Sequence, residues 1–323
     1  MRKILLTGIG GDVACAIMRS LLDAFPGDEI YGFDIKEYTP YMEKLKETVV
    51  APRYTDKNYI PFLKNYLEEK KITHFLPTTE PEILIADQNR AYFEEEGIRL
   101  MINHSELLQI CTSKFRTAEF LGNHGIPAPL SGMARNVRLY DEKGITLSGE
   151  DRMEFPLILK EDFGRGGHGI SLIRSKTEWE QEEKTGYICQ EFLDGLEYTV
   201  GVFSDGGQVR SITYRRELGL GGMSVSVECV DIPEIRRIAE RTAKVLSLRG
   251  SINLQLREHN GEYYIFEINP RLSSTTGFRH KMGFTDAVWW IELLDGETLQ
   301  GSYSEPVGMR GVKVTDDVVF PVA

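Results

Sequence analysis

The chain has 323 residues, of which 41% are hydrophobic and 27% charged, a composition typical of a folded globular protein that excludes intrinsic disorder. Its 38 Lys and Arg residues against 49 Asp and Glu residues give a formal net charge of −11, which argues against a general nucleic-acid binder. No apolar run is as long as a membrane span. The four cysteines (Cys15, Cys111, Cys189 and Cys229) are scattered, which argues against a disulfide framework and a zinc site and predicts a cytoplasmic protein.

The first third of the chain alternates short apolar runs with stretches of helical periodicity. This rhythm predicts a parallel β-sheet that is covered by helices on both faces. Expected strands cover residues 3–7, 29–33, 49–51, 73–76 and 98–102, and expected helices cover residues 13–24, 58–70 and 82–95. We therefore expect a Rossmann-like α/β domain over residues 1–110.

The pattern changes after residue 105. Two helices are expected over residues 105–125, with Thr112 or Ser113 capping the second, and residues 130–150 predict a loop or hairpin. Beyond residue 155 the strands are longer and joined by short turns, which is typical of antiparallel sheets and of an α+β arrangement. These strands are expected over residues 157–160, 170–174, 187–191, 198–204, 208–214, 223–229, 251–257 and 262–268, with helices over 231–248 and 284–294.

Polar side chains gather on one face of the hairpin expected over residues 251–268. Because alternate residues of a strand share a face, Asn253 lies with Gln255, and Glu267 with Asn269. The hairpin can bring the oxygen atoms of Gln255, Glu267 and Asn269 together, a set that suits Mg²⁺ completed by substrate phosphates. Arg271 follows and can bind phosphate or carboxylate in a bidentate manner. The alternative is a hairpin whose polar face is simply solvated.

Two further segments have the composition of a nucleotide site. The strand that ends at Lys160 leads into a loop with four glycines, whose N–H groups can approach a phosphate closely, although a flexible hairpin tip would look the same. The strand that ends at Glu191 is followed by a turn at Gly195 and a carboxylate at Glu197. Together these groups can bind an adenine edge and ribose hydroxyls.

These segments, in this order, resemble the ATP-grasp superfamily, most of all its carbamoyl-phosphate-synthase-like branch of carboxylate–amine ligases. The resemblance covers about residues 105–295. It implies a small subdomain with a glycine-rich lid over residues 111–186 and a large subdomain with the metal hairpin over residues 187–323, behind the usual preceding domain. It also implies ATP and Mg²⁺ as cofactors, with Mn²⁺ as the alternative ion.

The resemblance assigns roles residue by residue. Gln255, Glu267 and Asn269 correspond to the metal ligands, and Arg271 to the arginine that stabilises the acyl-phosphate. Lys160 corresponds to a lysine that contacts the ATP phosphates and contributes to catalysis. The full set that corresponds to the nucleotide site is Lys114, Lys160, Gly164, Gly166, Gly167, His168, Glu191, Phe192, Leu193, Glu197 and Gln255.

The segment after the metal hairpin is expected to be a loop beside the reaction centre. We therefore expect Arg279 and His280 to be catalytic residues. Arg279 would bind a substrate, and His280 would act as a base on the amine. The alternative for each is a structural role. Glu80 and Glu82, at the end of an expected strand and the start of a helix, are candidates for an amine, although solvated helix-start acids are favoured.

The turn at residues 8–11 partly fits a dinucleotide fingerprint, with Asp34 placed as a ribose-binding acid. Given the later segments, a tight strand-to-helix turn is the favoured interpretation. A substrate group at the helix N-terminus comes next, and an NAD-dependent oxidoreductase is the last alternative.

The combined pattern favours a ligase in which a carboxylate takes the γ-phosphate of ATP and an amine then displaces phosphate to form an amide. A kinase of the same fold and a nucleotide-binding regulatory protein are further alternatives. The segment Arg279-His280-x-x-Gly283-Phe284 resembles ATP-grasp proteins of cell-surface polysaccharide synthesis, and amino-acid-derived metabolites are the other lead. We expect small-molecule carboxylate and amine substrates, neither nucleic acid nor membrane as a partner, and a homodimer.

Overall fold

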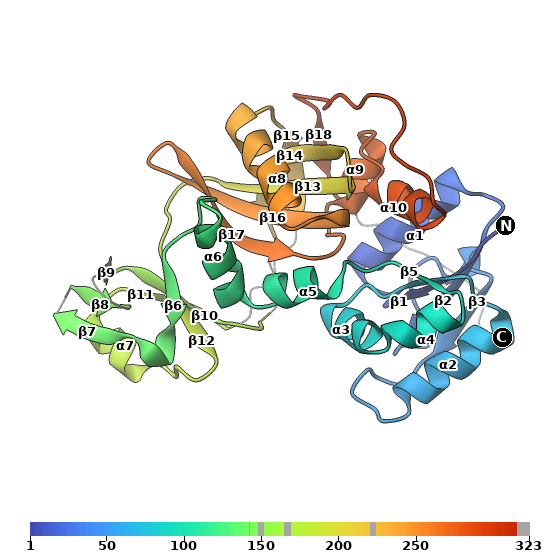
Figure 1. Cartoon of the computed structure of the whole chain (residues 1–323), viewed down its shortest axis with the longest axis horizontal. Coiled ribbons are helices and arrows are strands. Elements are labelled where there is room, and N and C mark those ends of the chain that lie inside the picture. Colours follow the sequence, from blue (N-terminus) through green and yellow to red (C-terminus); the bar gives the residue numbers. More distant parts are fainter. Residues whose placement is uncertain (142, 148–151, 165–168, 220–223, 315–323) are drawn as a thin grey trace.

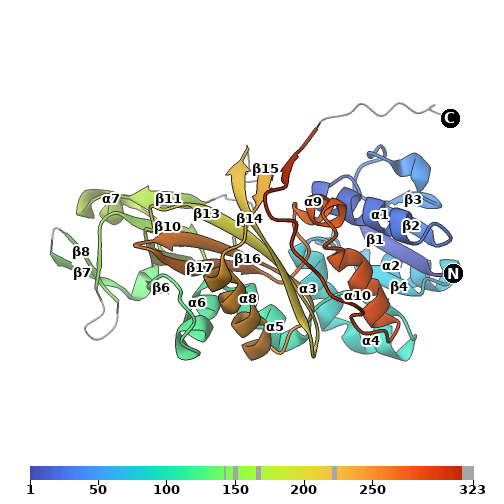
Figure 2. The ribbon, with the colours of Figure 1, turned by 90° about the horizontal axis from the view of Figure 1, so that it is seen from above.

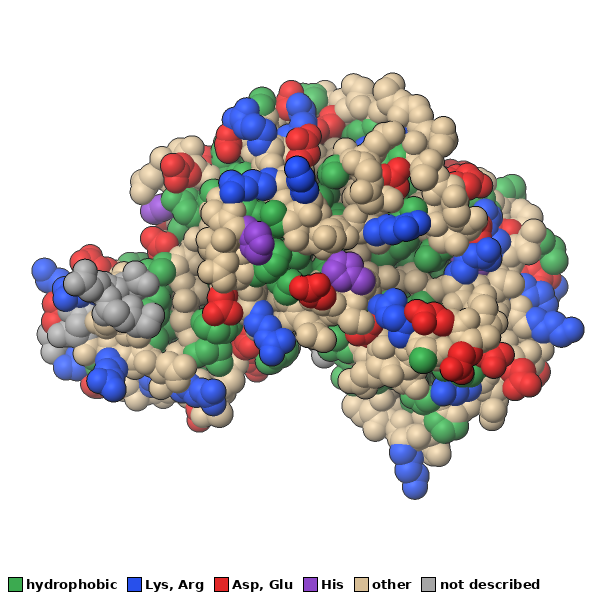
Figure 3. Space-filling model, viewed as in Figure 1, with side chains coloured by type: hydrophobic (Ala, Val, Ile, Leu, Met, Phe, Trp, Pro, Cys, Tyr) green, Lys and Arg blue, Asp and Glu red, His purple; other side chains and the backbone are tan. Residues whose placement is uncertain are grey.

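The computed structural model describes residues 1–141, 143–147, 152–164, 169–219 and 224–314. An N-terminal domain lies at one end of the long axis, a small lobe at the other, and a large antiparallel sheet between them (Figure 1, Figure 2). On the face shown in Figure 3, acidic and basic side chains are interspersed, and the outline is indented between the small lobe and the N-terminal domain. Among the described helices, each is too short or too polar to cross a membrane.

The N-terminal domain is the expected parallel sheet with helices on both faces. Its strand order is β3-β2-β1-β4-β5, and every neighbouring pair is parallel. Apolar residues of α1 pack on one face of the sheet, and those of α2, α3 and α4 pack on the other. The elements are β1 (Lys3–Thr7), α1 (Asp12–Ala24), β2 (Glu29–Asp34), the short η1 (Met42–Lys44), β3 (Glu47–Val50), α2 (Tyr59–Lys70), β4 (His74–Leu76), α3 (Glu80–Gln88), α4 (Arg90–Glu95) and β5 (Arg99–Leu100).

Two elements of this domain differ from expectation. The single helix expected over residues 82–95 is divided at Asn89, whose side-chain amide donates to the carbonyl oxygen of Ile85 at 2.9 Å and competes with the helical ladder. The last strand is shorter than expected, because the chain leaves the sheet to cross toward the central lobe. There Asn103 donates to the carbonyl oxygens of Ser251 and Pro270 at 2.9 and 3.0 Å.

The small lobe is antiparallel, as the strand pattern predicts. It combines a four-stranded sheet of order β11-β10-β12-β6 with a three-stranded sheet of order β7-β8-β9, around a core that includes Leu157, Leu159 and Trp179. The polar stretch 130–150 contributes a hairpin. The elements are β6 (Ser131–Met133), η2 (Ala134–Asn136), β7 (Arg138–Asp141), β8 (Gly144–Thr146), β9 (Arg152–Glu154), β10 (Leu157–Glu161), β11 (Ile170–Ile173), α7 (Lys176–Gln181) and β12 (Tyr187–Glu191).

The central lobe is built on a six-stranded sheet of order β17-β16-β13-β14-β15-β18. Alternate residues of its strands, such as Val200 and Leu254, pack against α5, α6 and α8, and the opposite face meets α1, α9 and α10. The elements are α5 (Ser105–Cys111), α6 (Lys114–Asn123), β13 (Glu197–Asp205), β14 (Val209–Leu218), β15 (Ser224–Cys229), α8 (Pro233–Val245), β16 (Arg249–His259), β17 (Glu262–Asn269), α9 (Thr276–Lys281), α10 (Asp286–Leu294) and β18 (Arg310–Val312).

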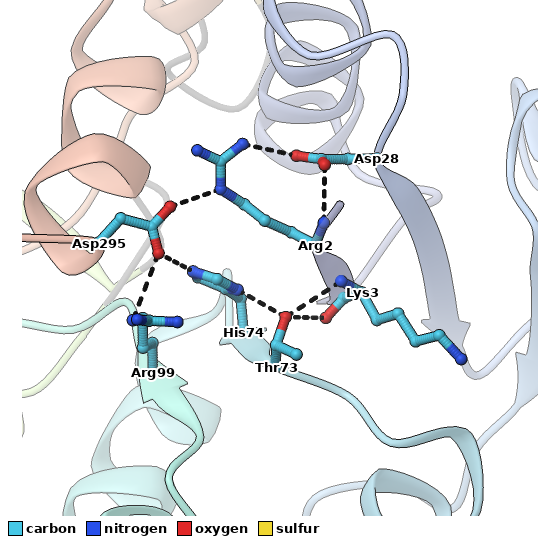
Figure 4. Close-up of polar contacts among 7 residues, drawn as sticks. All are labelled: Arg2, Lys3, Asp28, Thr73, His74, Arg99 and Asp295. Carbon is cyan, nitrogen blue, oxygen red and sulfur yellow. Dashed lines mark hydrogen bonds and ion pairs between the residues drawn. The ribbon is translucent and has the colours of Figure 1, made fainter.

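A polar network joins the N-terminal domain to the central lobe. Asp295, at the end of α10, pairs with Arg2, His74 and Arg99 of the N-terminal domain at 2.6, 3.2 and 3.3 Å (Figure 4). Asp28 holds Arg2 from the other side at 2.8 Å. A single carboxylate thus ties three cationic or ring nitrogen groups of one domain to a helix of the other.

Candidate active site

A cavity of about 670 Å³ runs from the small lobe, across the central sheet, to the N-terminal domain. Nine of the residues expected at the site line it: Lys160, Glu191, Phe192, Leu193, Glu197, Gln255, Glu267, Asn269 and Arg271. Gly166, Gly167 and His168 lie outside the described residues. The cavity therefore brings together segments that are far apart in the sequence.

The floor of the cavity is one face of the central sheet, where register places polar residues in rows. Gln255 lies opposite both Thr199 and Glu267, and Asn253 lies opposite Asn269. Residues that are opposite in antiparallel strands point to the same face, with Cβ atoms about 5 Å apart. The sheet thus places the Gln255, Glu267 and Asn269 side chains together, while Leu254 and Ile268 face the core behind it.

A register shift in this hairpin brings in an additional residue. The pairing of Gln255 with Glu267 is followed by that of Leu256 with Ile265, so Phe266 lies in a β-bulge. Both Phe266 and Glu267 consequently line the cavity, although neighbours in a regular strand point to opposite faces. The sequence reasoning missed Phe266, because period-two alternation assigns it to the other face.

Lys160, on β10, reaches the same space from the small lobe. Its Nζ donates to Oε1 of Gln190 at 2.9 Å and to the carbonyl oxygen of Phe266 at 3.3 Å, so it spans the two lobes. The side chain is buried, and this burial lowers the pKa of Lys160 to about 8, while the Glu267 carboxylate acts in the opposite direction.

Lys114 stabilises the loop that follows Lys160. Its Nζ donates to the carbonyl oxygens of Gly164 and Asp162 at 2.7 and 3.3 Å, and both Lys114 and Gly164 lie outside the cavity lining. Asp162 also accepts a hydrogen bond from the Ser113 hydroxyl at 3.0 Å. Ser113 caps the N-terminus of α6, and it is one of the two residues that the sequence offered as the cap. The contacts of Lys114 are with the backbone of the loop, which positions the loop relative to α6.

The structure corrects the expectation for Arg279 and His280, because residues 276–281 form helix α9 and not a loop. The helix directs Arg279 into the protein interior, where it is fully buried and pairs with Asp286 at 2.8 Å. His280 pairs with Asp23 on α1 at 2.8 Å. Neither residue lines the cavity, so a direct grip on substrate by Arg279 and a proton-accepting role for His280 are wrong in this structure.

Arg279 nevertheless contacts two residues that do line the cavity. It donates to the Asn253 Oδ1 atom and, at 3.0 Å, to the Ser273 hydroxyl. Because a guanidinium only donates, the Asn253 atom that faces it is the oxygen, which leaves the amide N–H groups for the cavity side. Gly201 makes room for the guanidinium, since a Cβ there would lie 2.5 Å from Arg279 Cζ.

The far end of the cavity belongs to the N-terminal domain. Residues of the turn before α1 and of the segment after β4 line it, and Glu80 accepts from Arg271 Nη2 at 3.2 Å across the domain boundary. Asp34 is engaged within the turn, where its Oδ2 accepts from the Gly10 N–H at 2.8 Å. Glu82 accepts hydrogen bonds from Thr7, Tyr59 and Thr79, so it stabilises this domain locally.

The donor set on the hairpin fits a hard divalent cation. One carboxylate and two amide oxygens are a small number of protein ligands, as expected for Mg²⁺, which keeps waters and takes phosphate oxygens. Within the described segments, groups of three or more His, Cys, Asp or Glu side chains able to hold a metal are absent. The hairpin residues therefore fit a magnesium–phosphate complex, in which the phosphates complete a ligand set that the protein only begins.

Comparison with known families gives two matches. The ATP-grasp domain family matches residues 111–275, and a family described as PylC-like, N-terminal domain, matches residues 4–101. Among curated proteins, the carbamoyl phosphate synthase large chain of Thermotoga maritima is 27% identical over 246 residues, or 69% of this chain and 22% of that protein. That of Thermomicrobium roseum is 24% identical over 204 residues, or 58% and 18%. The chain spans about a fifth of the length of these relatives.

Solved structures show the same fold at low identity. The biotin carboxylase domain of the Hydrogenobacter thermophilus 2-oxoglutarate carboxylase, a complex with MgADP, aligns with a TM-score of 0.73 at 16% identity, over 94% of this chain and 71% of that one. An L-amino acid ligase from Bacillus licheniformis gives 0.70 at 14%, over 91% and 74%. The N5-carboxyaminoimidazole ribonucleotide synthetase of Thermotoga maritima gives 0.68 at 19%, over 94% and 78%.

Proposed function

Because the chain belongs to the ATP-grasp family, we propose that it is an ATP- and Mg²⁺-dependent ligase that activates a carboxylate as an acyl-phosphate and joins it to an amine. One observation carries the proposal: Lys160, the segment Glu191 to Leu193 and the hairpin residues Glu267 and Asn269 face one cavity. This is the set of groups that phosphoryl transfer requires, since such catalysis rests on positioning and charge neutralisation.

Different parts of the nucleotide would bind at different positions along the cavity. Adenine would lie at Glu191 to Leu193 with its ribose toward Glu197, and the triphosphate would extend past Lys160 to the hairpin. Gln255, Glu267 and Asn269 would hold Mg²⁺, which supplies neutralisation of the phosphate charge. Lys160 donates hydrogen bonds to phosphate oxygens, and its burial strengthens that interaction.

The acceptor would bind between Arg271 and the N-terminal domain. A carboxylate oxygen of this substrate attacks the γ-phosphorus, the bond to the β-phosphate oxygen breaks, and ADP leaves. Arg271, which lines the cavity beside Asn269, offsets the negative charge on the acyl-phosphate. The nitrogen lone pair of the neutral amine then attacks the acyl carbon, the bond from that carbon to the phosphate oxygen breaks, and the nitrogen loses a proton as phosphate leaves. Glu80, in contact with Arg271, would bind the amino group of this second substrate.

The test is ATP turnover by the full chain with Mg²⁺ and pools of carboxylates and amines, measured as ADP and free phosphate. Glu267→Gln is expected to lower turnover by about 100-fold or more, because it removes the only carboxylate of the proposed ligand set. Glu262→Gln is the matched control, since Glu262 lies on the same strand but is exposed and hydrogen-bonded to Tyr264.

The products separate the ligase from its alternatives. Free phosphate that appears only when a carboxylate and an amine are both present supports the ligase. A stable phosphorylated product would instead identify a kinase, and equal turnover in Glu267→Gln and Glu262→Gln would contradict the assigned site. The cytoplasmic location and the homodimer stay predictions.

A further inference from the structure

Two arginines hold Glu197 at the hinge end of the cavity. Glu197 and Arg257 are opposite each other on β13 and β16, and Arg216 follows Arg215, which is opposite Tyr198 on β14. Three adjacent strands therefore bring the side chains of Arg216, Glu197 and Arg257 together in one row, and all three line the cavity. We call this row the Glu197 clamp.

Both carboxylate oxygens of Glu197 are engaged in the clamp. Oε1 accepts from Arg216 Nε at 3.1 Å and from Arg216 Nη2, and Oε2 accepts from Arg257 Nη2 at 2.7 Å. An ionised carboxylate offers about four acceptor positions. The two arginines fill three of these positions, so among the described residues one acceptor position of Glu197 remains for a ligand.

The clamp also fixes where that position points. The side chains of Glu197 and Arg216 are only 13% and 7% exposed, so neither is free to change rotamer. Arg257, which is 31% exposed, additionally donates through Nη1 to the Leu193 carbonyl oxygen at 3.3 Å. Arg257 thus ties the carboxylate to the same segment that is proposed to bind adenine.

Charge explains why two arginines are present and not one. A lone carboxylate that faces a polyanionic ligand would be repelled by it and would lose its own hydration. Two guanidinium groups give the row a formal net charge of +1, which offsets this repulsion. Removal of one arginine leaves a neutral pair in which one carboxylate oxygen of Glu197 has lost its hydrogen-bond donor.

We infer that Arg216 and Arg257 are positioning residues that aim Glu197 at a sugar hydroxyl and so make the site selective for ribonucleoside over deoxyribonucleoside triphosphates. The inference rests on the proposed nucleotide site. It goes further by assigning sugar discrimination to the geometry of the clamp, and not to Glu197 alone.

The test compares the affinities of three nucleotides, each with Mg²⁺, by calorimetry on the full chain: ATP, 2′-deoxy-ATP and 3′-deoxy-ATP. Wild type is expected to bind ATP about tenfold or more tightly than at least one deoxy analogue, which is the value of a hydrogen bond to a charged acceptor. In Arg257→Met this ratio is expected to fall to within about threefold of unity, while affinity for that analogue stays within about threefold of wild type.

Arg215→Met is the matched control, because Arg215 lies on the same strand as Arg216 and pairs with Glu228 outside the cavity lining. Arg215→Met should keep the wild-type ratio of ATP affinity to deoxy-analogue affinity. Arg257→Lys, which keeps a cation at this position, should retain part of that ratio. A variant that weakens all three nucleotides equally would show a purely structural role and overturn the inference. Wild type that binds ATP and both analogues equally would also overturn it while leaving the nucleotide site intact, whereas failure of wild type to bind any nucleotide would overturn the proposed function itself.

Discussion

The environment of one residue, Lys160, is expected to make the nucleotide affinity of the site depend on pH. Its buried ammonium group lies between Gln190 and Phe266, and desolvation lowers its pKa to about 8. Only the protonated form can hold a phosphate by charge and hydrogen bonds. The free protein therefore loses a phosphate-binding cation as the pH rises through that value.

The affinity for Mg²⁺–ATP is consequently expected to fall as the pH rises above about 8, approaching tenfold per pH unit, because binding must then take up a proton. Calorimetric titrations between about pH 7 and about pH 9.5 measure this slope. The variant Lys160→Arg carries a guanidinium that stays charged over the whole range, so it should abolish the slope. The same slope in both proteins would show that another group causes it.

Helix α9 shows how one element decides the role of its residues. It places Arg279 in the core, where the guanidinium pairs with Asp286, itself 1% exposed, and orients Asn253 and Ser273. Each of these buried charges is stable only beside the other, because a buried charge without a partner of opposite sign destabilises the fold. The element thus supports the cavity from behind.

Arg279→Met is expected to lower the free energy of unfolding by about 3–5 kcal/mol, because it leaves the Asp286 carboxylate buried without its cation. Urea unfolding followed by tryptophan fluorescence measures the loss. Adding Asp286→Leu should recover much of it, since the double variant buries no unpaired charge. Arg310→Met, which removes a 73% exposed arginine, is the control and should change little. No recovery in the double variant would contradict the ion-pair explanation.

At the scale of the whole molecule, the cavity exists because two domains meet. Its walls include residues of the turn before α1 and Glu80 from the N-terminal domain as well as the central sheet. Asp295 links these bodies through Arg2, His74 and Arg99. Desolvation alone would raise the pKa of Asp295, but the hydrogen bond from Arg2 and the nearby positive charges outweigh it and lower the pKa.

Asp295→Asn is expected to weaken this contact by about 1–2 kcal/mol, the value of charged hydrogen bonds discounted for partial exposure. Hydrogen exchange should then quicken together in β4 and α10, the two elements that the network joins. Asp231→Asn removes an exposed carboxylate that pairs with Arg236 inside the central lobe, and it should leave both elements unchanged. Equal effects of the two variants would mean that Asp295 does not hold the domains together.

Much of the fold and part of the site were predictable because they depend on short-range periodicity. The alternation of strands and helices predicted the parallel sheet, and the strand over residues 187–191 was predicted with its observed bounds. Period-two alternation also predicted that Gln255, Glu267 and Asn269 share a face, which the register confirms. These properties depend only on residues that lie a few positions apart in the sequence.

Other features depend on which segments meet, and local sequence does not encode that directly. The bulge that turns Phe266 into the cavity, the two arginines around Glu197 and the domain contact of Asp295 each arise from pairing across strands or lobes. Arg279 belongs here too, because a helix over residues 276–281 buries a side chain that a loop would have exposed. The sequence by itself determined which face a residue takes in the regular parts of a strand, since the backbone alternates there with a period of two. The tertiary structure alone decided the partners on that face, since register, burial and charge pairing are fixed only when distant strands pack.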